Sequence, residues 1–287
     1  MRDFKMSKKT LTILIVAVAA ALIVSFAFPA FASAAEAAQE AGGIGGFFVE
    51  LKDNIIEAFN ELKNDIYNVL IKNDNYRHIT DGLLVTIEIT LAALLIGLAI
   101  GFVVAIIRST HDKTGKFKFL DSICKLYLTV FRGTPVIVQL LIIYYLWLGK
   151  AGVHENIAAI IAFGVNSGAY VAEIVRSGIM SIDNGQFEAG RSLGFNYVQT
   201  MVYIVLPQAL KNVLPTLANE FIVLLKETSV ASFIAVKDMM KGANALVGFT
   251  YNMNIPYITV AIIYLVMVLV LQKGVNLLER RLRNSDH

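Results

Sequence analysis

The chain has few charged residues and a single cysteine, and each shortage excludes a class of protein. Of its 287 residues only 16% are charged, whereas 56% are hydrophobic, and the mean hydropathy is +0.64. Soluble domains are about 45–50% apolar, so we expect an integral membrane protein. The net charge of +3 is spread over scattered clusters, so no nucleic-acid partner is expected. Cys124 alone cannot form an internal disulfide or a metal cluster, and we expect it to pack in the interior.

Motifs of enzymes are also missing. The chain has no G-x-x-x-x-G-K-[ST] phosphate loop, so we expect it to bind no ATP and no other cofactor of its own. Its histidines form no H-E-x-x-H or similar array, and they are His78, His111, His154 and His287. We therefore expect no catalytic residues, no metal site and no enzymatic activity.

Residues 1–34 have the layout of a targeting segment. Four basic residues precede an apolar run over 11–28, and small residues with a possible cleavage site at Ala32-Ser33-Ala34 follow. This is typical of a secretory signal peptide, but a run of about 18 apolar residues can also remain as an N-terminal membrane anchor. In both cases the basic start stays in the cytoplasm and the following residues emerge outside.

Residues 35–80 are predicted to form an extracytoplasmic amphipathic helical segment. Apolar residues recur at helical spacing between Glu, Lys, Asp and Asn, at Ile55, Ile56, Phe59, Leu62, Ile66, Val69 and Leu70. Such a helix can lie on the outer membrane surface or pack against the membrane domain. It can equally be a spacer without a function of its own.

Five apolar segments dominate residues 81–283. They cover 82–107, 120–148, 156–176, 211–236 and 256–278. Each is long enough to cross about 30 Å of hydrocarbon as a helix. We therefore expect an all-α, polytopic transmembrane helical bundle of five core spans.

Basic residues set the expected orientation of these spans. The first connector contains Arg108, Lys113, Lys116 and Lys118, and the C-terminal tail contains Lys273, Arg280, Arg281 and Arg283. The connector over 149–155 has only Lys150. Because cytoplasmic loops are enriched in Lys and Arg, we expect the first connector, the 177–210 loop and the C-terminus in the cytoplasm.

The loop of residues 183–207 has the signals of two short helices. The Asp183-Asn184-Gly185 turn leads into a helix over 186–193, which Gly194 would end in a left-handed cap. Asn196 can then cap a second helix that leads to Pro207. The small Ala189 and Gly190 would let the first helix fit closely into a groove of a partner, with Glu188 and Arg191 as polar contacts. From the residues alone, a purely structural turn is an equal alternative.

The spacing within this loop resembles a known motif. The loop contains Glu188-Ala189-Gly190, followed by Gly194, Ile204 and Leu206-Pro207. This spacing resembles the EAA loop of membrane subunits of ABC importers, whose pattern is E-A-A, three residues, G, nine residues, I-x-L-P. The family usually has Ala where this chain has Gly190, which lowers helix propensity by about 1 kcal/mol. Four further stretches resemble the polar amino-acid permease branch of that family, and they are residues 127–141, 168–190 and 206–230 and the GLLVTIEIT sequence that begins at Gly82. The resemblance covers about residues 80–283.

This resemblance implies a permease subunit with an ABC type I importer-like fold in the bacterial inner membrane. It would pair as a homo- or heterodimer, receive a polar amino acid from an extracytoplasmic solute-binding protein, and be driven by ABC ATPase subunits that bind the ATP. Closure of the ATPase dimer would displace the loop and move the rigid spans. The residues expected to couple the two are Glu188, Ala189, Gly190, Arg191, Gly194 and Pro207.

Charged residues within spans are candidates for the substrate pathway, because burying them in a membrane is costly. Lys226 and Glu227 rank first, since they fall near the middle of the predicted fourth span. An ion-gradient transporter or channel that uses this pair is the alternative function. Further pathway candidates are Glu88, Asn166, Tyr170 and Thr134. Arg132, Glu173 and Arg176 lie toward cytoplasmic ends, where structural pairing or contact with lipid headgroups is the favoured role.

Three further features concern packing. Pro135 predicts a kink in the second span, which would open backbone groups toward the pathway or simply bend the helix. The pairs Gly97 with Gly101 and Gly164 with Gly168 permit close helix contacts. Aromatic residues at the outer end of the second span predict an interfacial belt, and they are Tyr144, Tyr145 and Trp147.

Overall fold

The computed structural model describes the backbone of residues 44–283 and the side-chain burial of residues 52–282. Every regular element within 44–283 is helical, as expected for an all-α protein. Contacts divide the chain into two compact units, the first ending at Asn73 and the second beginning at Asp74. The signal peptide or anchor expected over 1–34 lies outside the described residues.

The first unit contains the amphipathic helix expected from the sequence. Helix α2 (Ile44–Ile66) is followed by a π-helical turn, η1 (Tyr67–Ile71), and a short 3-10 turn, η2 (Lys72–Asp74). Asn73 and Asp74 both adopt left-handed backbone conformations, with φ of 59° and 57°. Such conformations cannot continue a right-handed helix, so the helical segment ends there.

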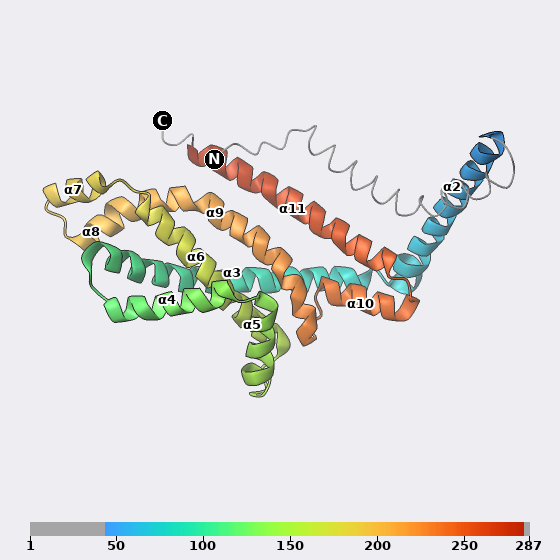
Figure 1. Cartoon of the computed structure of the whole chain (residues 1–287), viewed down its shortest axis with the longest axis horizontal. Coiled ribbons are helices and arrows are strands. Elements are labelled where there is room, and N and C mark those ends of the chain that lie inside the picture. Colours follow the sequence, from blue (N-terminus) through green and yellow to red (C-terminus); the bar gives the residue numbers. More distant parts are fainter. Residues whose placement is uncertain (1–43, 284–287) are drawn as a thin grey trace. The chain divides into compact units, whose positions relative to one another are not determined.

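The second unit is a bundle of long helices joined by shorter ones (Figure 1). Its elements are α3 (Arg77–Thr114), α4 (Lys118–Gly133), α5 (Val136–Ile142), η3 (Ile143–Leu148), α6 (Glu155–Met180), α7 (Asn184–Ser192), α8 (Tyr197–Thr200), η4 (Met201–Val205), α9 (Leu206–Glu227), η5 (Thr228–Ile234), α10 (Met239–Thr250) and α11 (Asn254–Arg283). Among the described residues, four helical segments are long and apolar enough to cross a membrane, and the number is five if the bent pair of α4 with α5 and η3 forms one span. The all-α, polytopic helical bundle is thus confirmed, with four to five candidate spans.

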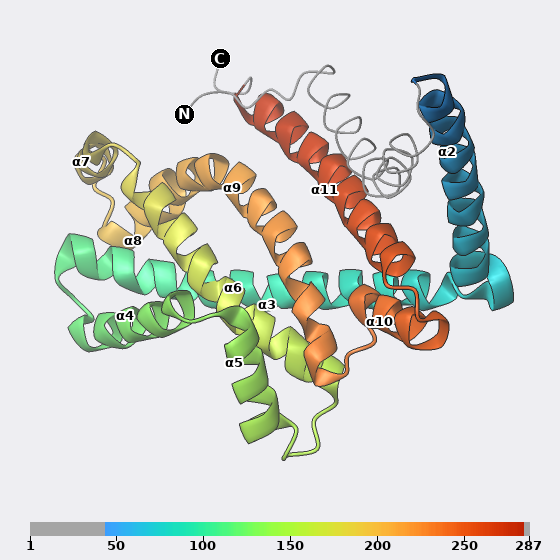
Figure 2. The ribbon, with the colours of Figure 1, turned by 45° about the vertical axis from the view of Figure 1, so that its right-hand side comes forward.

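Helices α3 and α6 pack closely at the centre of this bundle (Figure 2). A Cβ added to Gly97 of α3 would lie 3.1 Å from Ser167 Cβ of α6, and one added to Gly164 of α6 would lie 2.7 Å from Ile96 Cγ2 of α3. The missing side chains let the two backbones approach. The predicted packing role of the glycine pairs is therefore confirmed. Cys124 is buried against the same helices, as expected.

The second span is broken rather than mildly kinked. Helices α4 and α5 with η3 meet at an angle of 109°, because Thr134 is extended and Pro135 follows it. The break frees the carbonyls of Phe131 and Thr134, which accept hydrogen bonds from Gln139 Nε2 at 2.9 and 3.0 Å. Asn166 Nδ2 also donates to the Phe131 carbonyl, at 3.2 Å. The freed backbone groups are thus paired within the protein.

The fourth span begins earlier than the predicted 211. Helical structure runs over 38 residues from Tyr197 to Ile234, because the π-helical turn η4 continues α8 directly into α9. Pro207 lies in the first turn of α9, directly after the π-helical turn, and the helical structure continues through it. The stretch over 237–255, between the fourth and fifth apolar segments of the sequence, contains α10.

The two ends of the second unit are built from different elements (Figure 1). At one end α7 contacts the last turns of α3, where Lys113 Nζ donates to Asn184 Oδ1 at 2.6 Å and lies 4.9 Å from the Phe187 ring centroid. At the other end Met239 N of α10 donates to Thr86 Oγ1 near the start of α3, at 3.2 Å. Asp238 caps α10 there, and burial raises the pKa of its carboxyl to about 6.

Candidate coupling elbow and polar cavity

Helix α7 begins and ends as its sequence predicts. Asp183 Oδ1 accepts a hydrogen bond from Gly185 N at 2.6 Å and caps its start. At its end Gly194 has a φ of +81°, and Gly194 N donates to the Arg191 carbonyl at 2.9 Å. Only glycine adopts this conformation without strain. Gly194 therefore sets the direction in which the chain leaves α7.

Helix α8 follows immediately and is capped in both directions. Asn196 Oδ1 accepts from Gln199 N, and Gln199 Oε1 accepts from Asn196 N, both at 2.9 Å. This reciprocal capping box satisfies two backbone donors of the first turn. We call residues 183–207, which contain α7 and α8, the elbow.

The two arms of the elbow are packed against each other. Gly190 is buried, and a Cβ at this position would lie 2.6 Å from Thr200 Oγ1 and 2.7 Å from Thr200 Cγ2. The Phe187 and Tyr197 rings stack with centroids 6.3 Å apart. Gly190 therefore faces α8, not the partner groove expected from the sequence. The other expected contacts, Glu188, Ala189, Arg191, Gly194 and Pro207, are exposed.

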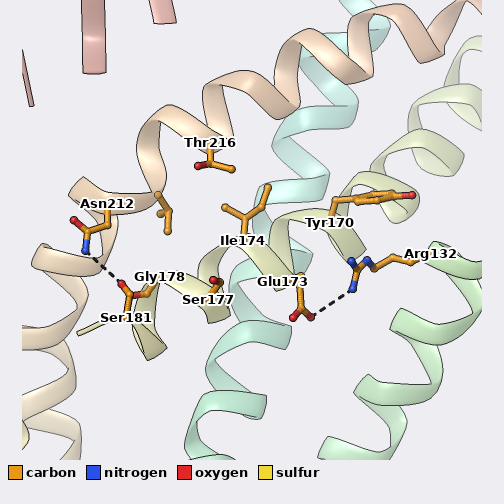
Figure 3. A pocket seen from close by; sticks show the side chains of 10 residues that line it. Arg132, Tyr170, Glu173, Ile174, Ser177, Gly178, Ser181, Asn212 and Thr216 are labelled. Atoms are coloured by element: carbon orange, nitrogen blue, oxygen red, sulfur yellow. Dashed lines mark hydrogen bonds and ion pairs between the residues drawn. The ribbon is translucent and has the colours of Figure 1, made fainter. Parts of the chain in front are cut away.

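A polar cavity of about 380 Å³ lies between α4, α6 and α9 (Figure 3). Its charged lining residues are Arg132 and Glu173, and the Tyr170 ring lies 5.7 Å from the Arg132 guanidinium. Hydroxyl and amide groups come from Ser177, Ser181, Asn212 and Thr216, and the lining is completed by Ile174, Gly178 and Val213. The cavity thus presents a cation, an anion and neutral hydrogen-bonding groups together.

Glu173 is the centre of an ion-pair network beside this cavity. Its carboxylate lies 2.9 Å from Arg176 Nη2, 3.4 Å from Arg108 Nη1 and 3.6 Å from Arg132 Nη1. Of the three charges predicted to have structural roles, Arg132 and Arg176 therefore both pair with Glu173. Arg132 is the most exposed of these groups, with 42% of its side chain accessible, so its guanidinium remains available to a carboxylate in the cavity.

A second carboxylate extends the network, and sequence reasoning missed it. Asp121 is 1% exposed and lies 2.7 Å from Lys125 Nζ and 3.4 Å from Arg108 Nε. Arg108 thus bridges Asp121 and Glu173 and links α3 to α4 and α6. The available signal was an acidic residue among apolar ones at the start of the second predicted span.

Lys226 and Glu227 lie nearer the end than the middle of the helical segment Tyr197–Ile234, and their role in the substrate pathway stays a prediction. They are the last two residues of α9, and Lys226 is exposed. The charge nearer the middle is Glu220, which accepts a hydrogen bond from Ser167 Oγ at 3.2 Å. Its position within the predicted span was a signal that sequence reasoning passed over.

The remaining pathway candidates are spread over the bundle. Asn166 is 2% exposed and donates to Gln139 Oε1 at 2.8 Å, so it stabilises the broken span. Thr134 is exposed at the break and donates to the Val130 carbonyl. Glu88 is exposed on α3. Of the predicted pathway set, only Tyr170 lines the polar cavity.

The fold and the elbow match a known class of transport protein. The family model for the binding-protein-dependent transport system inner membrane component matches residues 97–284. The chain belongs to this family and is a membrane-spanning permease subunit of an ABC importer. It is a multi-pass protein of the inner membrane, and it is a transport subunit, not an enzyme.

Curated relatives match most of their own length. The arginine transport system permease protein ArtQ of Bacillus subtilis (strain 168) is 38% identical over 210 residues, 72% of this chain and 94% of the relative. A putative glutamine transport system permease protein GlnP of Rickettsia bellii (strain RML369-C) is 37% identical over 206 residues, 71% and 92% of the two chains.

Solved structures agree with the fold. A chain from the crystal structure of an amino acid ABC transporter with histidines is 40% identical, with a TM-score of 0.66 over 72% of this chain and 94% of that one. An inward-facing MetNI methionine ABC transporter chain has a TM-score of 0.63 at 20% identity, covering 71% of this chain and 95% of that one. The latter likeness supports the fold alone.

Proposed function

We propose that this permease moves a polar amino acid, delivered by an extracytoplasmic solute-binding protein, into the cytoplasm. The observation that carries the proposal is the 40% identity to a chain of a solved amino acid ABC transporter, at a TM-score of 0.66. The polar cavity adds support, because the exposed guanidinium of Arg132 can pair with a carboxylate, and oxygen atoms of Ser177 and Asn212 can accept hydrogen bonds from an ammonium group. A free amino acid has both groups.

The transporter would contain a second permease, identical or related, and two ATPase subunits that bind and hydrolyse ATP. The elbow and the C-terminus would lie in the cytoplasm, as the basic connectors favour. Contact between Lys113 of the first connector and Asn184 of α7 supports this orientation, since both segments must then be on one side.

The elbow would couple ATP hydrolysis to transport. Its exposed face offers Glu188, Ala189 and Arg191 to an ATPase subunit. A displacement there passes directly into the fourth span, because helical structure is continuous from Tyr197 to Ile234. Asn212 and Thr216 of this span line the polar cavity. A push on the elbow would thus move one cavity wall as a rigid body.

Two matched glycine variants test the elbow. Gly194 and Gly115 both have positive φ, at +81° and +70°, and a Cβ at either position would meet nothing within 4 Å. Gly194→Val and Gly115→Val therefore introduce similar backbone strain, about 1–3 kcal/mol, inside the elbow and outside it. The proposal expects Gly194→Val to lower ATPase stimulation by the binding protein about tenfold.

The measurement uses permease and ATPase subunits purified together and reconstituted in liposomes. Gly115→Val should retain ATPase stimulation close to that of the wild type. Equal activities of the two variants, or a permease that never co-purifies with an ATPase subunit, would refute the coupling role of the elbow.

A further inference from the structure

Helix α2 has an apolar face with no partner within the described part of its unit. Ile55, Phe59, Leu62 and Ile66 recur at spacings of three or four residues and so lie on one side of the helix. Ile55 is 47% exposed, Phe59 67% and Ile66 40%. An apolar stripe over three helical turns is unfavourable in water, so the stripe requires an apolar environment.

The charges of α2 are arranged around this stripe. Asp53, Glu57 and Glu61 follow one another at intervals of four residues, which places them in a row on the side opposite Phe59. Lys52 and Lys63 are eleven residues apart, about three turns, and therefore lie along one border of the stripe. Lysine side chains in this position can extend along apolar surface while their ammonium groups reach phosphates.

This pattern fits a lipid surface better than a protein groove. The α2 helix is not among the segments apolar enough to cross a membrane, yet only ten residues, 67–76, separate it from α3, the first described span. Ten residues reach at most about 35 Å when extended, so this linker allows α2 to lie on the membrane surface on the side where α3 begins. Anionic headgroups would repel the acidic row unless it faced water, which leaves the stripe facing the lipid.

We propose that α2 lies in the plane of the bilayer interface, on the side where α3 begins. Ile55, Phe59, Leu62 and Ile66 would insert about 5–10 Å, into the boundary between headgroups and acyl chains. Lys52 and Lys63 would contact lipid phosphates, and the acidic row would face water.

Tryptophan fluorescence in brominated lipids tests this placement. Trp147 is the only tryptophan of the chain, so full-length Trp147→Phe protein in nanodiscs is the background. Phe59→Trp places the probe in the stripe, and Asn64→Trp is the matched control, because Asn64 is neutral, exposed and five residues along on the polar side. We expect a blue-shifted emission that loses most of its intensity in acyl-brominated lipid for Phe59→Trp, and neither effect for Asn64→Trp.

Three results would overturn the proposal. If Phe59→Trp emits as in water, the stripe is solvated. If its emission is blue-shifted but unaffected by brominated lipid, protein covers the stripe. If both probes are quenched alike, α2 is immersed without the proposed orientation. Ile55→Trp reports on the same face and replaces Phe59→Trp if that variant does not fold.

Discussion

Replacing Gly190 by alanine, the residue that the EAA pattern usually has, should impair this permease. The new Cβ would lie 2.6 Å from Thr200 Oγ1, 2.7 Å from Thr200 Cγ2 and 3.1 Å from Thr200 Cβ. The first two distances are too short, so either the buried Thr200 side chain must turn or α7 must move away from α8. Overpacking of this kind costs about 1–3 kcal/mol, and the better helix propensity of alanine returns only about 1 kcal/mol.

The double variant Gly190→Ala/Thr200→Ala isolates this contact. Replacing Thr200 by alanine removes Oγ1 and Cγ2 and leaves only the 3.1 Å contact, which small shifts can relieve. We therefore expect Gly190→Ala to lower ATP-driven uptake in proteoliposomes about threefold to tenfold, for a net cost of about 1 kcal/mol. The double variant should regain most of the uptake, and Thr200→Ala alone should remain close to the wild type.

The only cysteine provides a control for the global fold. Cys124 is buried among α3, α4 and α6, with only 7% of its surface exposed. A thiol-reactive dye therefore labels it only when the bundle opens on heating. Gly190→Ala should leave this labelling temperature nearly unchanged, since the strain is confined to the elbow. Full uptake by Gly190→Ala, or a double variant no better than the single one, would refute the reasoning.

Three further predictions concern the bundle. Glu173→Gln removes the acceptor shared by three arginines and should lower the labelling temperature of Cys124, for a cost of about 1–3 kcal/mol. Asn166→Leu removes a donor to the Phe131 carbonyl and should destabilise the broken span by about 1–3 kcal/mol. Burial raises the pKa of Asp238 to about 6 from 3.8, so the folded state binds the proton more tightly and stability should fall by up to about 3 kcal/mol as the pH rises from 4 to 7. The difference in stability between the wild type and Asp238→Asn should therefore fall as the pH rises over this range.

Different results would contradict each expectation. An unchanged labelling temperature in Glu173→Gln or Asn166→Leu would mean that these contacts contribute no net stability. For Asp238, an identical pH profile in the wild type and in Asp238→Asn would show that its carboxyl is not the group that titrates.

The elbow was predictable because its signals are local. Gly194 ends α7 and Asn196 begins α8 through contacts within a few residues, and such caps depend little on the rest of the fold. Gly190 is the contrast. The sequence shows that Gly190 has no side chain, but the contact of Gly190 with Thr200 depends on how α7 packs against α8. That packing cannot be read from the sequence.

The register of the fourth span could not be read from hydropathy. Pro207 suggested a boundary, whereas the π-helical turn over Met201–Val205 lets the helix continue from the elbow. Because the helical segment begins at Tyr197 and not at 211, its middle lies closer to Glu220, and Lys226 and Glu227 lie nearer its end. Helix α10 could not be read from hydropathy either, because its 12 residues are too few for a span.

The central claim is that ATP hydrolysis by separate subunits drives amino-acid uptake through this permease. The direct test is accumulation of labelled arginine and glutamine, the amino acids named for its relatives, in proteoliposomes with the ATPase subunits and the solute-binding protein. We predict accumulation of one of these or of a similar polar amino acid only when ATP is supplied on the ATPase side, whether or not an ion gradient is present. Uptake that persists without ATP and disappears when the ion gradient collapses would contradict the account.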